Sequence, residues 1–144
     1  MCEPTFVSAA LAAGTGLLLS FCAGVIPAKD SPGREWDAPA RAAGIKNPIP
    51  ADDQSIAAGK IVYTKECSAC HGESGRGNGP EAANLSRQPA DLCAAPVQQQ
   101  RDGEIFWKIT EGKKPMPSYA HTLKDEERWQ VVNYIRSLAP GNAR

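Results

Sequence analysis

Apolar residues recur with a helical period in three parts of the chain, and no segment alternates with the two-residue period of a strand. The last part is the clearest, because apolar residues stand at three-residue steps from Trp129 to Leu138. We predict an amphipathic helix there, with Thr122 as its N-terminal cap and Pro140 beyond its end. Its apolar face consists of Trp129, Val132, Ile135 and Leu138.

A second helix is predicted to start at Asp53 or Ser55, either of which can cap it, and to reach the region of Cys67. Gly59 either lets another helix approach closely or is a tolerated weak point that costs about 1 kcal/mol. Three residues of this helix lie three and four positions apart and share one face, namely Ile56, Gly59 and Tyr63.

Residues 72–96 are rich in glycine and proline, which predicts a loop. A short third helix is predicted from Asp102, as its cap, to Glu111, with Gly112 as its stop. Two prolines then flank Met116 and forbid regular structure. The chain is therefore predicted to be all-α, with three to four helices and long loops.

The first 28 residues form a segment of a different kind. No charged residue occurs from Pro4 to Ala28, a run of 25, which predicts a secretory signal or a membrane anchor. The sequence before Cys22 resembles a bacterial lipoprotein box, although Phe21 is larger than the residue usual there. Lipidation at Cys22, cleavage near Ala28 and an uncleaved anchor are three alternatives, and each places the remainder outside the cytoplasm.

A proline-rich linker is predicted at residues 29–53, and the main domain at residues 54–141. Prolines at this density oppose a helix and favour extended chain, which suits the tether of a membrane-anchored domain. The end of the linker, Asn47–Pro50, is expected to wrap onto the domain.

Charge and composition exclude some functions. The 16 Lys and Arg residues balance the 16 Asp and Glu residues, so the chain lacks the positive charge of a general nucleic-acid binder. Its 144 residues suit one domain. With 13 glycines, 12 prolines and only nine aromatic residues, the core would be thin unless something other than side chains fills it.

The candidate chemistry lies in Cys67-Ser68-Ala69-Cys70-His71. Cysteines three apart in a helical turn lie on one face, so both sulfurs can reach one planar partner. The adjacent histidine can place its imidazole over the centre of that plane. This arrangement attaches a porphyrin through two thioether bonds while its iron takes the histidine.

Three other interpretations of these residues remain open. A thioredoxin-like dithiol needs a βαβ context, and the sequence shows none. A zinc site of Cys67, Cys70, His71 and Cys93 has four ligands, but adjacent ligands at positions 70 and 71 fit one tetrahedral ion poorly. A disulfide between the two nearby cysteines would leave the histidine without a role.

Further motifs follow one another in order: Ala58-Gly59-Lys60 with Tyr63, the cysteine pair with His71 and Gly72, Gly77-Asn78-Gly79-Pro80 with Leu85, Asp102–Ile109, Met116-Pro117 and Trp129–Ile135. Together they resemble the class I, monohaem c-type cytochromes of bacteria. The resemblance extends from Ser55 to Leu138.

The resemblance implies a small helical domain around one haem c, attached at Cys67 and Cys70. It implies that His71 and Met116 are the axial ligands of the iron, and that the carbonyl of Pro80 accepts a hydrogen bond from the histidine. A neutral thioether as the second ligand favours ferrous iron.

Each of these roles has a plainer alternative. Met116 is otherwise a core residue, and Pro80 otherwise only shapes a turn. His121 is a second candidate for the distal ligand and otherwise faces solvent. Cys93 departs from the family pattern and is either a small buried residue or a pairing or reactive thiol. Two aromatic residues either reach the haem propionates or pack in the core, namely Trp107 and Tyr119.

The predicted function is one-electron transfer between redox protein partners on the periplasmic side, by a domain attached to the cytoplasmic membrane. We expect no small-molecule substrate and no enzymatic activity. The alternative is a five-coordinate haem that binds a small gas or peroxide, which requires that Met116 does not bind the iron.

Overall fold

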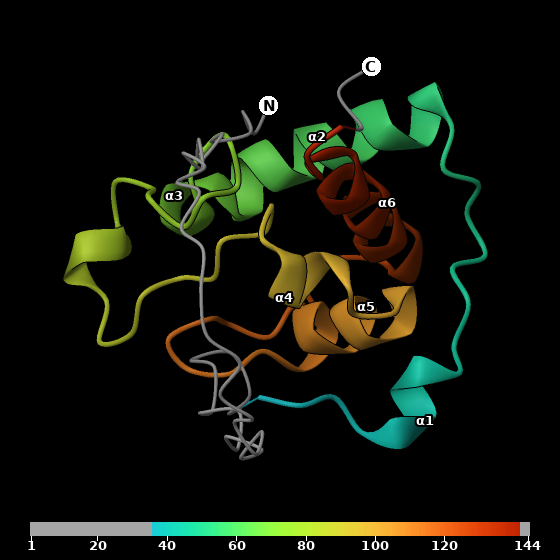
Figure 1. The fold of residues 1–144 in the computed structure, drawn as a ribbon, viewed down its shortest axis with the longest axis horizontal. Helices are drawn as coiled ribbons and strands as arrows, with labels where there is room; N and C mark the ends of the chain where they lie inside the picture. The colour runs from blue at the N-terminus through green and yellow to red at the C-terminus, as the bar shows by residue number, and fades with distance from the viewer. Residues whose placement is uncertain (1–35, 142–144) are drawn as a thin grey trace, which may run out of the picture.

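The computed structural model describes residues 36–141, and the predictions for residues 1–28 and for Cys22 lie outside this range. Within the range, helices and loops surround one core, which confirms the predicted all-α class (Figure 1). None of the described helices is both long and apolar enough to cross a membrane. In chain order the helices are α1 (Ala40–Ala43), α2 (Asp53–Glu66), α3 (Ser68–His71), η1 (Ala82–Asn84), α4 (Ala95–Gln98), α5 (Asp102–Glu111) and α6 (Asp125–Ser137).

The two longest helices, α2 and α6, cross at Gly59. A Cβ atom at this position would lie 2.0 Å from the carbonyl oxygen of Gln130, so the two backbones are almost in contact. One turn further along α2, the rings of Tyr63 and Tyr134 pack with their centroids 4.9 Å apart. The prediction that Gly59 serves a close helix approach is confirmed.

The three longest helices correspond to the three predicted ones, but their caps differ. Asp52, rather than Asp53 or Ser55, caps α2, because its carboxylate accepts a hydrogen bond of 2.7 Å from the amide of Ser55. The predicted start was therefore one to three residues late.

The predicted caps of α5 and α6 are also wrong. Asp102 is the first residue of α5, and α6 begins three positions after Thr122. In both helices a glutamate in the first turn accepts a hydrogen bond from the amide just before the helix, which replaces a side-chain cap at that residue. The pairs are Glu104 with Arg101, at 2.6 Å, and Glu127 with Lys124, at 2.8 Å.

Residues 39–50 form a segment, called here the N-terminal strap, that packs against α5 and α6. The prediction of extended chain is wrong for α1, where Ala42 is buried and its carbonyl oxygen would lie 2.1 Å from a Cβ atom at Gly103. The expected wrapping of Asn47–Pro50 is confirmed, since Asn47 donates a hydrogen bond of 2.7 Å to Asn133 of α6.

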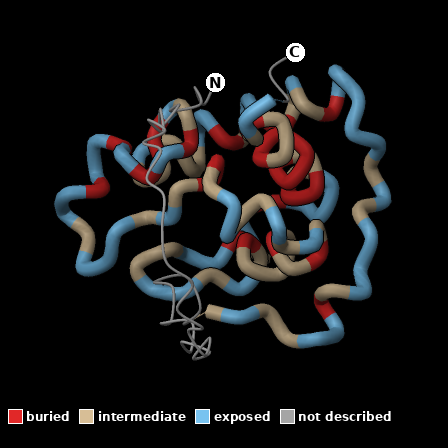
Figure 2. The backbone as a smooth tube through the Cα atoms, in the orientation of Figure 1, coloured by how far each residue is buried: buried red, intermediate tan, exposed pale blue. Residues whose placement is uncertain are grey.

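The core is built mainly by α6, whose residues are buried over most of its length (Figure 2). Val131 and Val132 are almost inaccessible to solvent. All four residues of the predicted apolar face are buried, which confirms that face. Residues 72–96 run mostly as loop, as predicted, interrupted by η1 and the start of α4.

We expect Gly59→Ala to destabilise the protein. In an unconstrained helix this change stabilises by about 1 kcal/mol, but here the new methyl group meets the backbone of Gln130. Overpacking of this kind should lower the free energy of unfolding by about 2 kcal/mol, as measured by chemical denaturation.

Gly44→Ala is the matched control. Its φ is −82°, and the nearest atom to a new Cβ, the Arg41 carbonyl oxygen, lies at an ordinary 3.6 Å. If Gly59→Ala were as stable as the wild type or more stable, the close crossing of α2 and α6 would be contradicted.

Candidate functional site

Residues Cys67–His71 form one helical turn directly beyond α2. Cys67 breaks the longer helix with φ −119°, and α3 follows at once. The amides of Cys70 and His71 both donate to the carbonyl of Cys67, at 3.2 and 2.9 Å. Gly72 ends the turn with φ +78°, a conformation that favours glycine. The two cysteines therefore stand on one helical turn, as their spacing predicted.

Two buried tyrosines hold the ends of this turn. Tyr63 donates a hydrogen bond of 2.7 Å from its hydroxyl to the carbonyl of Gly72, just after the turn. Tyr119 donates one of 2.7 Å to the carbonyl of Glu66, just before it. The turn Cys67–His71, called here the attachment turn, is thus fixed from α2 on one side and from the segment after Met116 on the other.

The two thiols are free and half-buried. Burial raises the pKa of Cys67 to about 12, and the neighbouring Glu66 and Cys70 act in the same direction. Without a metal, such a thiol stays neutral at pH 7. Within residues 36–141, no three His, Cys, Asp or Glu side chains gather in a metal-binding group. The second observation disfavours the zinc interpretation.

The imidazole of His71 is positioned by a backbone carbonyl. Its Nδ1 lies 3.1 Å from the carbonyl oxygen of Ala90. Burial lowers the pKa of His71, while this hydrogen bond acts in the opposite direction. A neutral imidazole that donates from Nδ1 keeps the lone pair of Nε2 available for a metal.

The sequence predicted Pro80 as the partner of the histidine, and the structure places Ala90 there instead. The residues on both sides of Pro80 explain the difference. The amide of Gly79 donates to Cys70 and that of Glu81 donates to Ala69, so Pro80 is held against the backbone of α3. Among the described residues, no hydrogen bond joins Pro80 to the histidine.

Met116 stands on the loop formed by residues 112–119. Gly112 begins the loop with φ +65°, and a Cβ atom there would lie 2.4 Å from the carbonyl of Pro117. The loop therefore folds tightly back on itself. The side chain of Met116 is half-buried and packs against the same core cluster as Cys67. Its role as an iron ligand stays a prediction.

Two other residues singled out in the sequence are His121 and Cys93. His121 is exposed, as its solvent-facing interpretation requires. Cys93 is 5% exposed, and its Sγ lies 3.2 Å from the carbonyl oxygen of Ser74.

Sequence reasoning missed Arg128, a buried cation. Its guanidinium donates from Nη1 to Thr110 at 2.6 Å, pairs with Asp125, and lies over the ring of Phe106 at 4.9 Å from its centroid. The same ring stacks on Trp129, with centroids 3.9 Å apart. Arginine within an apolar helix pattern gives no signal of burial, because Thr110 and Phe106, which line its buried side, lie on another helix, α5.

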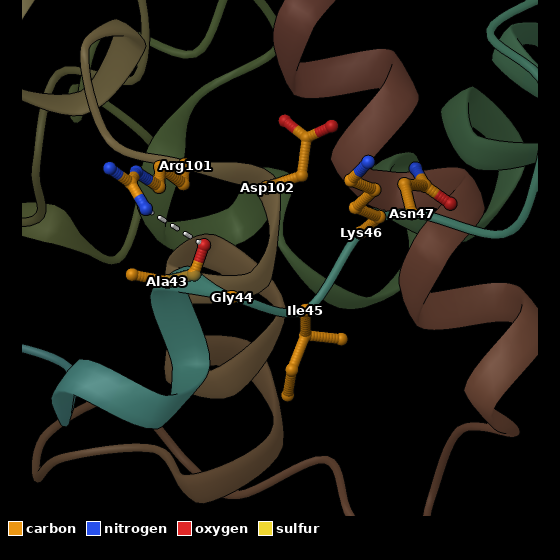
Figure 3. Close-up of a pocket in the computed structure, with 7 residues that line it drawn as sticks. All are labelled: Ala43, Gly44, Ile45, Lys46, Asn47, Arg101 and Asp102. Carbon is orange, nitrogen blue, oxygen red and sulfur yellow. Dashed lines mark hydrogen bonds between the residues drawn. The ribbon is translucent and has the colours of Figure 1, made fainter.

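The pocket in Figure 3 lies away from the candidate site, between the N-terminal strap and the start of α5. Within it, Arg101 donates a hydrogen bond of 3.4 Å to the carbonyl of Ala43. None of the predicted site residues lines it. The lining residues are Ala43, Gly44, Ile45, Lys46, Asn47, Arg101 and Asp102.

The donor set of the candidate site fits a covalently held porphyrin. Two thiols stand on one turn, and the next residue presents a positioned imidazole. A soft thioether packs against the same core. Thiols able to form thioether bonds, with nitrogen and sulfur donors for iron, are the groups that hold haem in proteins.

The comparisons with known proteins agree with this donor set. The family described as cytochrome c oxidase, cbb3-type, subunit III matches residues 54–135. Cytochrome c6 of Chlorolobion braunii is 30% identical over 95 residues, which cover 62% of this chain and 98% of that protein. Quinohemoprotein alcohol dehydrogenase ADH IIB of Pseudomonas putida is 34% identical over 103 residues, which cover 69% of this chain but only 14% of the enzyme.

A solved structure shows the same fold. A chain of the reducing HAO-like protein complex of Kuenenia stuttgartiensis matches with a TM-score of 0.57 and 32% sequence identity. The match covers 64% of this chain and 47% of that one.

We expect stability to fall at alkaline pH, partly through Tyr63. Burial raises the pKa of this phenol well above its ordinary value, and Cys67 and Tyr134 act in the same direction. The unfolded phenol loses its proton near pH 10, while the folded one keeps it. The unfolded state then binds fewer protons, so the free energy of unfolding falls as pH rises beyond about 10.

Tyr63→Phe isolates this contribution. At pH 7 it should lower the free energy of unfolding by about 1 kcal/mol, through the lost hydrogen bond. Between pH 9 and pH 11 it should lose less additional stability than the wild type, as measured by urea denaturation. Equal alkaline losses in the two proteins would show that this phenol titrates normally.

Proposed function

This chain belongs to the cytochrome c family and carries one covalently bound haem c, and on that premise we propose that it transfers single electrons between redox proteins with His71 and Met116 as axial ligands. Proteins of this kind are electron carriers and not enzymes. The observation that carries the proposal is the turn Cys67–His71, which offers two thiols and a positioned imidazole on one helical turn.

The residues of the turn have distinct roles in this proposal. Cys67 and Cys70 hold the haem by two thioether bonds. His71 binds iron through Nε2, while Ala90 fixes the orientation of its ring through Nδ1. Haem c supplies an iron that alternates between the ferric and ferrous states.

Met116 is proposed as the second ligand for three reasons. It is the only methionine within residues 36–141, it packs against the same core as Cys67, and its loop is tightly folded. A thioether stabilises ferrous iron, which raises the reduction potential relative to a second histidine. A closed iron with two protein ligands transfers electrons without binding a substrate.

We expect the oxidised wild type to show the weak near-infrared band of methionine bound to ferric haem. Met116→Ala should abolish this band, lower the reduction potential, and open the reduced iron to carbon monoxide. His121→Ala is the control, because it removes the other candidate ligand from an exposed position. It should leave spectrum and potential unchanged.

Two outcomes would overturn this ligation. If His121→Ala rather than Met116→Ala changes the spectrum, the ligand is misassigned. If the reduced wild type already binds carbon monoxide rapidly, the iron is five-coordinate, and the chain binds a small gas or peroxide.

We also propose a periplasmic location with attachment to the cytoplasmic membrane. The support is the uncharged run from Pro4 to Ala28 and the proline-rich residues 29–53 that follow. The boundaries at residues 28 and 53 stay predictions.

Cell fractionation tests this location. The haem protein should appear outside the cytoplasm and mostly in the membrane pellet. If labelled palmitate is incorporated, Cys22→Ala should release the protein. A soluble mature form that begins near Lys29 would refute the attachment and leave export intact.

A further inference from the structure

Tyr119 links the loop that carries Met116 to the start of the attachment turn. Its hydroxyl donates a hydrogen bond of 2.7 Å to the carbonyl of Glu66. Glu66 is the last residue of α2, and the last carbonyls of a helix have no partner within it. The phenol therefore satisfies a carbonyl that would otherwise need water, immediately before Cys67.

The backbone of Tyr119 is fixed on the opposite side. Its amide donates to the carbonyl of Ile109 at 3.2 Å, and its carbonyl accepts from the amide of Leu123 at 3.1 Å. The hydroxyl of the preceding residue, Ser118, also donates a hydrogen bond to the carbonyl of Thr110, near the end of α5. The side chain of Tyr119 thus joins the α5 side of the loop to the junction of α2 and α3.

We propose that Tyr119 is a positioning residue for Met116, which holds the loop against the segment that carries His71 and so limits how often the thioether leaves the iron. The inference rests on the proposed ligation by His71 and Met116. Met116 is three residues away on a short loop, so a fixed phenol restricts the distance that the thioether can move.

The phenol is suited to this role at neutral pH. Tyr119 is 8% exposed, and burial, with smaller contributions from Cys67, Glu66 and Cys70, raises its pKa to about 12. The hydroxyl is therefore protonated and available as a donor. A buried hydrogen bond of this kind is costly to break, because its carbonyl partner would be left unsatisfied.

Tyr63 provides a matched control. Its hydroxyl also donates a hydrogen bond of 2.7 Å, to the carbonyl of Gly72 at the other end of the same turn. It stands on α2, however, and not beside Met116. Tyr119→Phe and Tyr63→Phe each remove one buried phenol bond to the turn, but only Tyr119→Phe releases the loop.

The experiment compares these two variants with the wild type as intact haem proteins. Imidazole is mixed with the oxidised protein, and its rate of binding reports how often Met116 leaves the iron. Tyr119→Phe should raise this rate about five-fold, the factor that corresponds to one net buried hydrogen bond. Tyr63→Phe should leave the rate within about two-fold of the wild type.

A second measurement separates local opening from general instability. The near-infrared band of the methionine ligand and the far-ultraviolet circular dichroism are followed together in urea. In Tyr119→Phe the band should disappear at a lower urea concentration than the helices unfold. In Tyr63→Phe both transitions should shift together.

The outcomes distinguish this inference from the proposed function. If the band is present in the wild type but both variants bind imidazole equally fast, Tyr119 has only a structural role and the ligation stands. Coincident urea transitions in Tyr119→Phe would likewise overturn the positioning role. If the wild type lacks the band, the ligation by Met116 fails, and the positioning role fails with it.

Discussion

The contact of two backbones at Gly59 is the constraint on which the site depends. Because no side chain separates α2 from α6 at this point, the rings of Tyr63 and Tyr134 meet one turn later. The crossing therefore sets the direction in which α2 ends, and with it the position of the attachment turn. It also places the Tyr63 phenol within reach of Gly72. A wider crossing would withdraw that phenol and release one end of the turn, so the rigidity of the site originates in the core.

The attachment turn could be predicted from the sequence because its geometry is local. A single helical turn is enough to bring Cys67 and Cys70 to one face and to place His71 beside them. The three longest helices were predictable for the same reason, since their apolar periods lie within each segment. The close approach at Gly59 could be anticipated from a glycine on an apolar helix face.

The parts that sequence reasoning missed are set by distant partners. The partner of His71 is Ala90, a residue 19 positions away whose side chain carries no signal of this contact. The bond from Tyr119 spans 53 positions. Arg128 is buried because, besides its ion pair with Asp125 on the same helix, the Thr110 hydroxyl and the Phe106 ring of α5 compensate its charge. The helix α1 has too few residues to form alone, and it is stabilised by packing at Gly103.

Asn133 has a consequence for how this domain can change during evolution. Its amide group accepts from Asn47 and donates to the carbonyls of Ile49 and Pro50 and to the hydroxyl of Ser55. One side chain on the last long helix thus provides hydrogen-bond partners for polar groups of both the strap and the start of α2. A lineage that discards the strap has no use for an asparagine at this buried position, where an apolar residue would then pack better. A chain that keeps the strap but replaces this asparagine would leave several polar groups without hydrogen-bond partners, so we expect the strap and Asn133 to be kept or lost together.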